Sequence, residues 1–310
     1  MTRRIVVGNH SLAHELRQVW TFGGLDFFTL ARKVYNELSE DDVWGYAAQL
    51  AYYFLFALFP FFIFLAALLA YIPIPDLMQH IMELVSEFVP GTASGMIQEN
   101  VEKLVTQPRG GLLSLGIGLA LWASSSAIVA IAESLNRAYG VREGRPFWLV
   151  RGVAILLTIG LAVLVILSMA LLIFGPELGY WLANYFDAGA AFDAAWAIMR
   201  WPLVVFLMTF AVALIYYFAP DVEQEWRWIT PGSVFAVLMW IVVSLAFGYY
   251  VDNFGQYDKT YGSIGAVIVL LTWMYLSGFS ILVGGEINAE IEHAAAHGKN
   301  EGEKKLPEKK

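Results

Sequence analysis

The sequence contains no cysteine, and charged residues make up only 15% of its 310 positions. Without cysteine there is no disulfide framework, no thiolate zinc site and no cysteine nucleophile. The phosphate-binding GxxxxGK[ST] loop and the HExxH and GxSxG motifs are also missing. Two histidine pairs at helical spacing, His10/His14 and His293/His297, have no carboxylate or cysteine partners at a clear geometry. We therefore expect no enzymatic activity, no catalytic residue, no cofactor and no metal site.

Long apolar segments dominate what is present. Hydrophobic residues make up 58% of the chain, and the mean hydropathy is +0.60. A segment of about 20 apolar residues crosses the bilayer core as a helix, at 1.5 Å per residue. The sequence predicts an all-α, polytopic membrane protein with a six-helix membrane domain over residues 45–292. The predicted spans are 45–72, 111–132, 152–175, 201–219, 229–251 and 262–285.

Three segments outside the spans have patterns of their own. Residues 1–44 are amphipathic, and they either lie on the cytoplasmic leaflet or cover the base of the helix bundle. Between spans 1 and 2 we expect a helical outer loop, which either caps a pathway or packs at the interface. Residues 293–310 are rich in His, Gly, Lys and Glu, so we expect a disordered tail.

Lysine and arginine are unevenly distributed between the predicted loops. Fifteen fall in the N-terminal region, the 2–3 loop, the 4–5 loop and the tail, against four in the opposite loops, which are Lys103, Arg109, Arg200 and Lys259. Cytoplasmic loops carry the excess of positive residues. Both termini are therefore predicted to be cytoplasmic.

Tryptophan and serine recur as Trp-x-x-x-Ser near the middle of three spans, where tryptophan is unusual. Serine, tryptophan and glycine also form one stripe on each of the last two spans, which predicts close helix packing. We interpret the indole N–H groups as directed into the bundle, where they line a central cavity that meets an amphipathic cargo. The predicted pathway-lining residues are Gln49, Tyr53, Trp122, Ser126, Trp240, Ser244, Trp273 and Ser277.

Polar residues also gather at both ends of the spans. A cytoplasmic polar cluster is predicted from Glu133, Asn136, Arg137, Arg151, Glu286 and Asn288, with Glu286 approaching Arg137 or Arg151. Alternatively, Glu133 and Arg137 form only an i, i+4 pair at a helix end. An outer gate is predicted from Asp252, Asn253, Tyr257, Lys259 and Tyr261, or these residues stabilise only their own turn.

Four long stretches make the chain resemble the YihY/BrkB family of bacterial inner-membrane proteins. They are AAQLAYYFLFALFPFF at 47–62, LWASSSAIVAIAESLNRAYGV at 121–141, WITPGSVFAVLMW at 228–240, and the stretch that starts YVDNFGQYDKTYGS at 250 and ends at 292. The resemblance implies six membrane helices with cytoplasmic termini. A ribonuclease label circulates in this family, but the metal cluster or basic aromatic groove that RNA cleavage needs is not evident here.

These observations favour a transporter, exporter or lipid-translocating protein of the cell envelope in the bacterial inner membrane. Membrane lipids and an amphipathic or anionic cargo are the expected partners, and nucleic acid is not expected. Coupling to protons or ions has little support, because Glu133 and Glu286 both lie at the cytoplasmic end. The alternative is a structural or regulatory membrane scaffold with a sealed core.

Overall fold

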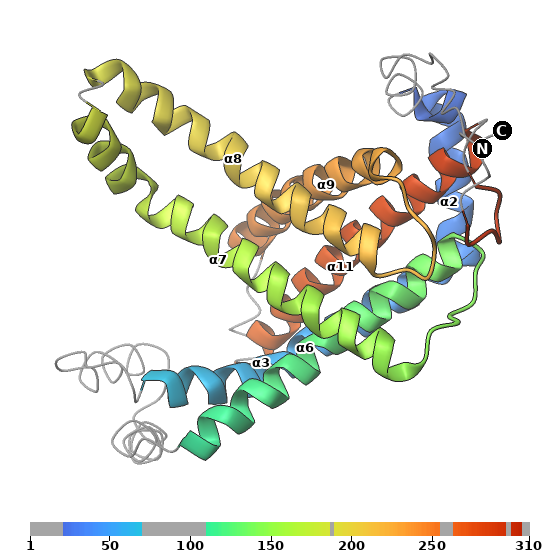
Figure 1. Ribbon diagram of the computed structural model, residues 1–310, viewed down its shortest axis with the longest axis horizontal. Helices are drawn as coiled ribbons and strands as arrows, with labels where there is room; N and C mark the ends of the chain where they lie inside the picture. Colours follow the sequence, from blue (N-terminus) through green and yellow to red (C-terminus); the bar gives the residue numbers. More distant parts are fainter. Residues whose placement is uncertain (1–20, 70–109, 187–188, 255–262, 296–298, 306–310) are drawn as a thin grey trace, which may run out of the picture. The chain divides into compact units, whose positions relative to one another are not determined.

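A computed structural model describes residues 21–69, 110–186, 189–254, 263–295 and 299–305 (Figure 1). Every regular element in this part of the chain is helical, which confirms the prediction of an all-α protein. The elements are η1 (Phe22–Gly24), α2 (Phe27–Glu40), α3 (Val43–Leu69), α6 (Gly110–Ala138), α7 (Phe147–Phe186), α8 (Gly189–Phe218), α9 (Trp226–Phe254) and α11 (Ser263–Ala294).

Five of the described helices are long and apolar enough to cross a membrane. The segments are Ser114–Ala138, Phe147–Leu182, Ala194–Phe218, Thr230–Val251 and Gly265–Ala294. They correspond to the second to sixth predicted spans. The first predicted span, 45–72, lies partly outside the described residues, although its described part belongs to one 27-residue helix, α3.

The chain forms two compact units, and α3 and α6 each pass from one unit into the other. The first unit holds the described residues of Met1–Ala51 and Ala127–Lys310, and the second holds those of Tyr52–Ser126. In the first unit, α9 and α11 lie side by side, and α7 and α8 form an antiparallel hairpin (Figure 1).

Helices α7 and α8 extend beyond the predicted spans. The third predicted span ends at 175 and the fourth begins at 201, but the neighbouring Pro176 and Pro202 both lie inside helices. A proline removes one backbone hydrogen bond, and a long helix tolerates this loss with a kink. The segment between the two spans is therefore helical wherever it is described.

Glycines bring helices close together around the C-terminal half of α11. A Cβ atom on Gly284 would lie 2.6 Å from the carbonyl oxygen of Gly232 and 2.7 Å from the Cβ of Ala236, both on α9. A Cβ on Gly285 would collide with Leu135 of α6. Because contacts this short with backbone atoms are forbidden, only glycine at position 284 permits the observed distance between α9 and α11, as small residues do at membrane helix interfaces generally.

Helix α2 covers the end of α11 that follows this packed region. Asp26 caps its N-terminus by accepting a hydrogen bond from the Thr29 backbone N–H at 3.1 Å. Leu30, Val34 and Leu38 form its buried face, and α2 packs on α11. For this helix the structure favours the second prediction, a helix that covers the base of the bundle.

Candidate functional site

The Trp-x-x-x-Ser motifs of α9 and α11 pair with each other. Trp240 Nε1 of α9 donates to Ser277 Oγ of α11 at 3.0 Å, and Trp273 Nε1 of α11 donates to Ser244 Oγ of α9 at 3.2 Å. The two indole rings meet edge to face with centroids 6.2 Å apart. Each motif thus supplies the donor for one interhelical bond and the acceptor for the other, which explains why tryptophan is placed at mid-span.

The other predicted pathway residues lie on α3 and α6. Trp122 is 51% exposed, and the Ser126 hydroxyl donates to the Trp122 carbonyl within α6 at 3.0 Å. Gln49 and Tyr53 are partly buried on α3. Gln49 belongs to the first unit, while Tyr53, Trp122 and Ser126 belong to the second. The Trp–Ser pairing described above is formed by residues of α9 and α11.

The predicted cytoplasmic cluster is distributed over several contacts. Asn288 accepts a buried hydrogen bond from the Gly232 backbone N–H at 2.7 Å. The Arg137 guanidinium lies 5.1 Å from the centre of the Tyr46 ring, and that of Arg151 lies 5.6 Å from the centre of the Phe147 ring. A larger polar network, which the sequence did not reveal, forms around Asn136.

Asn136, at the end of α6, joins two loops that are distant in sequence. Its Nδ2 donates to Glu143 Oε2 at 3.1 Å, and its Oδ1 accepts from the Asp221 backbone N–H at 2.7 Å. Glu143 lies in the α6–α7 loop and Asp221 in the α8–α9 loop. One buried amide, 3% exposed, therefore fixes the relative position of both loops.

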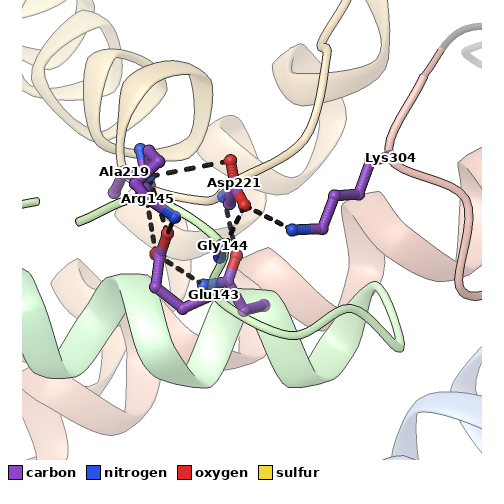
Figure 2. Close-up of polar contacts among 7 residues, drawn as sticks. Glu143, Gly144, Arg145, Ala219, Asp221 and Lys304 are labelled. Atoms are coloured by element: carbon purple, nitrogen blue, oxygen red, sulfur yellow. Dashed lines mark hydrogen bonds and ion pairs between the residues drawn. The ribbon is translucent and has the colours of Figure 1, made fainter.

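Arg145 strengthens the same junction. Its guanidinium donates to both Glu143 carboxylate oxygens, at 2.9 and 2.7 Å, and to the Ala219 carbonyl at 2.7 Å. Figure 2 shows Arg145 between Glu143 and Asp221, with Lys304 reaching Asp221 from the C-terminal segment. Burial acts to raise the pKa of Glu143, but the hydrogen bonds from Arg145 outweigh it and lower this pKa to about 2.

The C-terminal segment, residues 299–305, continues this network. The Gly302 N–H donates to the Tyr139 carbonyl at 2.9 Å, and the Glu223 N–H donates to the Lys304 carbonyl at 2.7 Å. Lys304 forms an ion pair with Asp221. Backbone bonds and lysine contacts give this segment partners that its composition alone does not show, and the disorder predicted for the whole tail stays a prediction.

A fully buried ion pair lies beneath the segment. Lys299 Nζ is 2.7 Å from Glu292 Oε1, and neither side chain is exposed. Nζ also donates to the Glu223 carbonyl at 2.6 Å and lies 5.3 Å from the centre of the Tyr139 ring. A buried ammonium needs several such partners, because removing it from water costs several kcal/mol.

Several polar atoms around this pair have no hydrogen-bond partner in the described part of the chain. They are Tyr139 Oη, Glu292 Oε2, His293 Nε2 and both amide atoms of Gln224. Burial raises the pKa of Tyr139, and the charge of Glu292 adds to this effect. Buried polar groups normally bond to protein or ordered water, so this is a buried polar cluster of high electrostatic cost.

Glu286 is the buried carboxyl closest to the glycine-packed region. It is 2% exposed, and no hydrogen bond or ion pair joins it to another described residue; its approach to Arg137 or Arg151 stays a prediction. The nearby carboxylates of Asp41, Glu37 and Glu290 disfavour a negative charge on Glu286. Burial raises the pKa of Asp41 to about 6, against the lowering effect of Arg137.

One member of this cluster of acidic residues forms an ion pair. Lys33 of α2 forms an ion pair with Glu290 of α11 at 2.8 Å. Burial raises the pKa of Glu37, and the charge of Glu290 is the next cause. Glu133, which was predicted to belong to the cluster, is exposed on α6.

The predicted outer gate lies mostly outside the described residues. This applies to Tyr257, Lys259 and Tyr261. Asp252 and Asn253 belong to the last turn of α9, where Asn253 Nδ2 donates to the Tyr249 carbonyl at 2.8 Å. The local bond of Asn253 is of the kind expected for a helix end.

The sequence reasoning missed Lys299, Glu292, Tyr139, Asp221 and Gln224. One signal for the ion pair was available, since Glu292 and Lys299 are seven residues apart around the end of a predicted helix. The contacts of Asp221 had no such signal, because its partners Asn136 and Lys304 are 85 and 83 residues away.

Comparisons with known proteins give a consistent result. The family model described as Virulence factor BrkB matches residues 34–308. A protein of Bacillus subtilis named as ribonuclease-like, YfkH, is 40% identical over 78% of this chain and 88% of its own length. A UPF0761 membrane protein of Xanthomonas campestris is 27% identical over 85% of this chain, which spans 60% of that protein's length. No solved structure matches the chain.

Proposed function

This chain belongs to the Virulence factor BrkB family, and from that premise we propose that it is a transporter, exporter or lipid-translocating protein of the cell envelope. In this proposal it resides in the bacterial inner membrane. Its cargo is amphipathic or anionic, which includes membrane lipids. Helix α3 supplies the first of the six spans and adds to the five described above, since residues 43–69 form a 27-residue helix without a charged side chain.

Contacts within the first unit support a common side for the termini and two loops. The C-terminal segment bonds to the α6–α7 loop and to the α8–α9 loop, and α2 packs on the end of α11. Segments that touch one another must lie on one side of a membrane. This side carries most of the lysines and arginines, so we assign it to the cytoplasm.

The observation that carries the proposal is the buried carboxyl of Glu286 within a membrane-spanning helix. An ionisable group inside a membrane protein is costly, and such groups mark ion or substrate pathways. Glu286 has no pairing cation among the described residues, so an ion pair does not explain its burial. A scaffold with a sealed core would gain nothing from such a group. We infer that Glu286 serves the transport cycle, as a coupling or cargo-contacting carboxyl.

Reconstitution into proteoliposomes tests the proposal. Purified protein is incorporated into vesicles that contain a fluorescent phospholipid, and movement between leaflets is followed by chemical quenching of the outer leaflet, with and without a pH gradient. We expect the wild type to accelerate this movement over protein-free vesicles. Glu286→Gln, which keeps the shape but removes the charge, should lower the rate at least tenfold.

The matched control is Glu40→Gln, which removes an exposed carboxylate of α2 and should retain the wild-type rate. Thermal stability in detergent establishes that each variant is folded. Wild-type protein that moves neither this lipid nor other anionic amphiphiles would overturn the proposal and favour the scaffold. A Glu286→Gln variant with full activity would leave transport standing but remove Glu286 from it.

A further inference from the structure

An arginine lies at the outer edge of the α7–α8 hairpin. Arg200 is 18 residues before the end of α8 at Phe218, which is about 27 Å along the helix. Phe218 is followed by the loop that contacts the C-terminal segment. Because the hydrocarbon core is about 30 Å thick, Arg200 lies where the opposite leaflet's headgroups begin.

The surroundings of Arg200 are shaped by glycine and tryptophan. The nearest heavy atom to a Cβ built on Gly175 of α7 would be the Cδ of Arg200, at 3.4 Å. Trp196 Nε1, one turn earlier on α8, donates to the Gly175 carbonyl at 2.6 Å. The Trp196 ring occupies the space that any side chain at Gly179 would need. Gly179 of α7 therefore makes room for the Trp196 ring of α8, and the two helices lie side by side (Figure 1).

The guanidinium has no anionic partner in the described residues. Its Nε is buried without a hydrogen-bond acceptor, and its Cζ lies 5.6 Å from the centre of the Trp201 ring. Glu177 lies near this depth on α7, but it is exposed and forms no ion pair with Arg200. A buried donor on a permanent cation without an acceptor is costly, so a partner is expected from outside these residues.

Phosphate is the acceptor that fits both the chemistry and the depth. The planar guanidinium binds phosphate oxygens through paired hydrogen bonds. Trp201 and Trp181 are more than half exposed, and exposed tryptophans of this kind occupy the headgroup level of membranes. The exposed leucine, isoleucine and phenylalanine side chains of α7 and α8 offer acyl chains an apolar surface directly below.

We propose that Arg200, with Trp196 and Trp201 beside it, binds the phosphate of an anionic phospholipid at the outer end of the α7–α8 hairpin. Gly179 lets the Trp196 ring pack on α7 beside this arginine. This inference goes beyond the proposed function, because the site can hold a lipid whether or not the protein moves it.

Equilibrium lipid binding tests the site, and no transport measurement enters the test. Native mass spectrometry follows the full-length protein, freed of lipid in detergent, as phosphatidylglycerol is added. A galactolipid with the same acyl chains and no phosphate is the second probe, and inorganic phosphate is the third. We expect Arg200→Gln to weaken phosphatidylglycerol binding roughly tenfold or more, since it removes hydrogen bonds to a charged group. Binding of the galactolipid should not change.

Arg142→Gln is the matched control, because Arg142 is an exposed arginine of the α6–α7 loop. It should bind phosphatidylglycerol as the wild type does. Arg200→Lys keeps the charge without the paired geometry and should give an intermediate affinity. A phosphatidylglycerol with a photoreactive headgroup should label peptides near Gly175 in the wild type.

Three results would overturn the proposal. The first is equal phosphatidylglycerol affinity for wild type and Arg200→Gln. The second is an equal loss in Arg142→Gln, which would indicate attraction by net charge alone. The third is inorganic phosphate binding as tightly as the lipid, which would identify a site for a free anion. Melting temperatures of the variants separate loss of binding from loss of fold.

Discussion

Replacing Lys299 with methionine removes the cation from a pair in which neither side chain touches solvent. Methionine preserves the length of the side chain and its packing on the Tyr139 ring. It leaves the Glu292 carboxylate buried without its cation. One oxygen of this carboxylate, Oε2, already has no hydrogen-bond partner among the described residues. The Glu223 carbonyl also loses its donor. The perturbation therefore leaves one charge and one carbonyl unsatisfied.

The magnitude follows from the burial. Removing one partner of a buried ion pair costs about 3–5 kcal/mol, because the remaining charge stays desolvated. At about 1.4 kcal/mol per factor of ten, the equilibrium between the docked and the released C-terminal segment should shift by roughly two to four powers of ten. An exposed pair would shift it by less than one.

Hydrogen exchange measures this shift at two backbone amides. The Gly302 N–H bonds to the Tyr139 carbonyl and the Glu223 N–H bonds to the Lys304 carbonyl, so both exchange only when the segment opens. Mass spectrometry of peptides covering 219–225 and 299–305 should show faster exchange in Lys299→Met. Lys305→Met, which replaces an exposed lysine of the same segment, should exchange as the wild type does.

The double variant Glu292→Leu with Lys299→Met separates the charge from the packing. An apolar pair of similar volume is often neutral or stabilising in place of a buried ion pair, so we expect it to recover most of the protection. Wild-type exchange rates in Lys299→Met would refute the reasoning, because they would mean that the ion pair does not hold the segment.

Three further predictions concern the helix group. Gly284→Ala should destabilise the protein by about 1–3 kcal/mol, because the new methyl group would collide with the Tyr216 hydroxyl; an unchanged melting temperature in detergent would contradict this. Trp240→Phe removes the donor to Ser277 and should cost about 1 kcal/mol, with no additional loss when Ser277→Ala is combined with it in a double-mutant cycle. Asp41→Asn should raise the melting temperature at pH 8 and change it little near pH 4, because burial raises the pKa of Asp41 to about 6 and the stability linked to its protonation is lost as pH rises through that value; an equal effect at both pH values would refute this.

Apolar length and small-residue spacing predicted the helices and their closest contacts. The stripes of α9 and α11 contain Trp240, Ser244, Trp273 and Ser277, and the structure pairs these residues across the two helices. The pattern worked because a membrane helix has one periodicity, so residues three and four apart must share a face. The hydrogen-bond partner of each indole could not be predicted from the sequence, because it depends on the relative rotation and depth of the two helices.

The polar end was less predictable. Asn136 was identified as part of a polar cluster, but its partners lie in the α6–α7 and α8–α9 loops, whose conformation the span pattern does not predict. At the opposite end of the hairpin, α7 and α8 continue past the predicted span limits and contain Pro176 and Pro202, because a missing backbone bond is tolerated in a long helix. The composition of the tail predicted disorder, yet one buried lysine and two backbone bonds define residues 299–305. Composition averages over a segment and cannot detect a single strong anchor.

The distribution of bonds along α8 indicates which part of the first unit can bend. Its C-terminal half is fixed, because the Tyr216 hydroxyl donates to the Ile281 carbonyl of α11 and the Ala219 carbonyl accepts from Arg145. Pro202 removes one helical hydrogen bond from the N-terminal half of α8, and Pro176 does the same in α7. Kinks concentrate at such positions. We therefore expect bending of the hairpin to move its outer turns, with the phosphate site at their base, while the glycine-packed contact of α9 and α11 keeps its geometry.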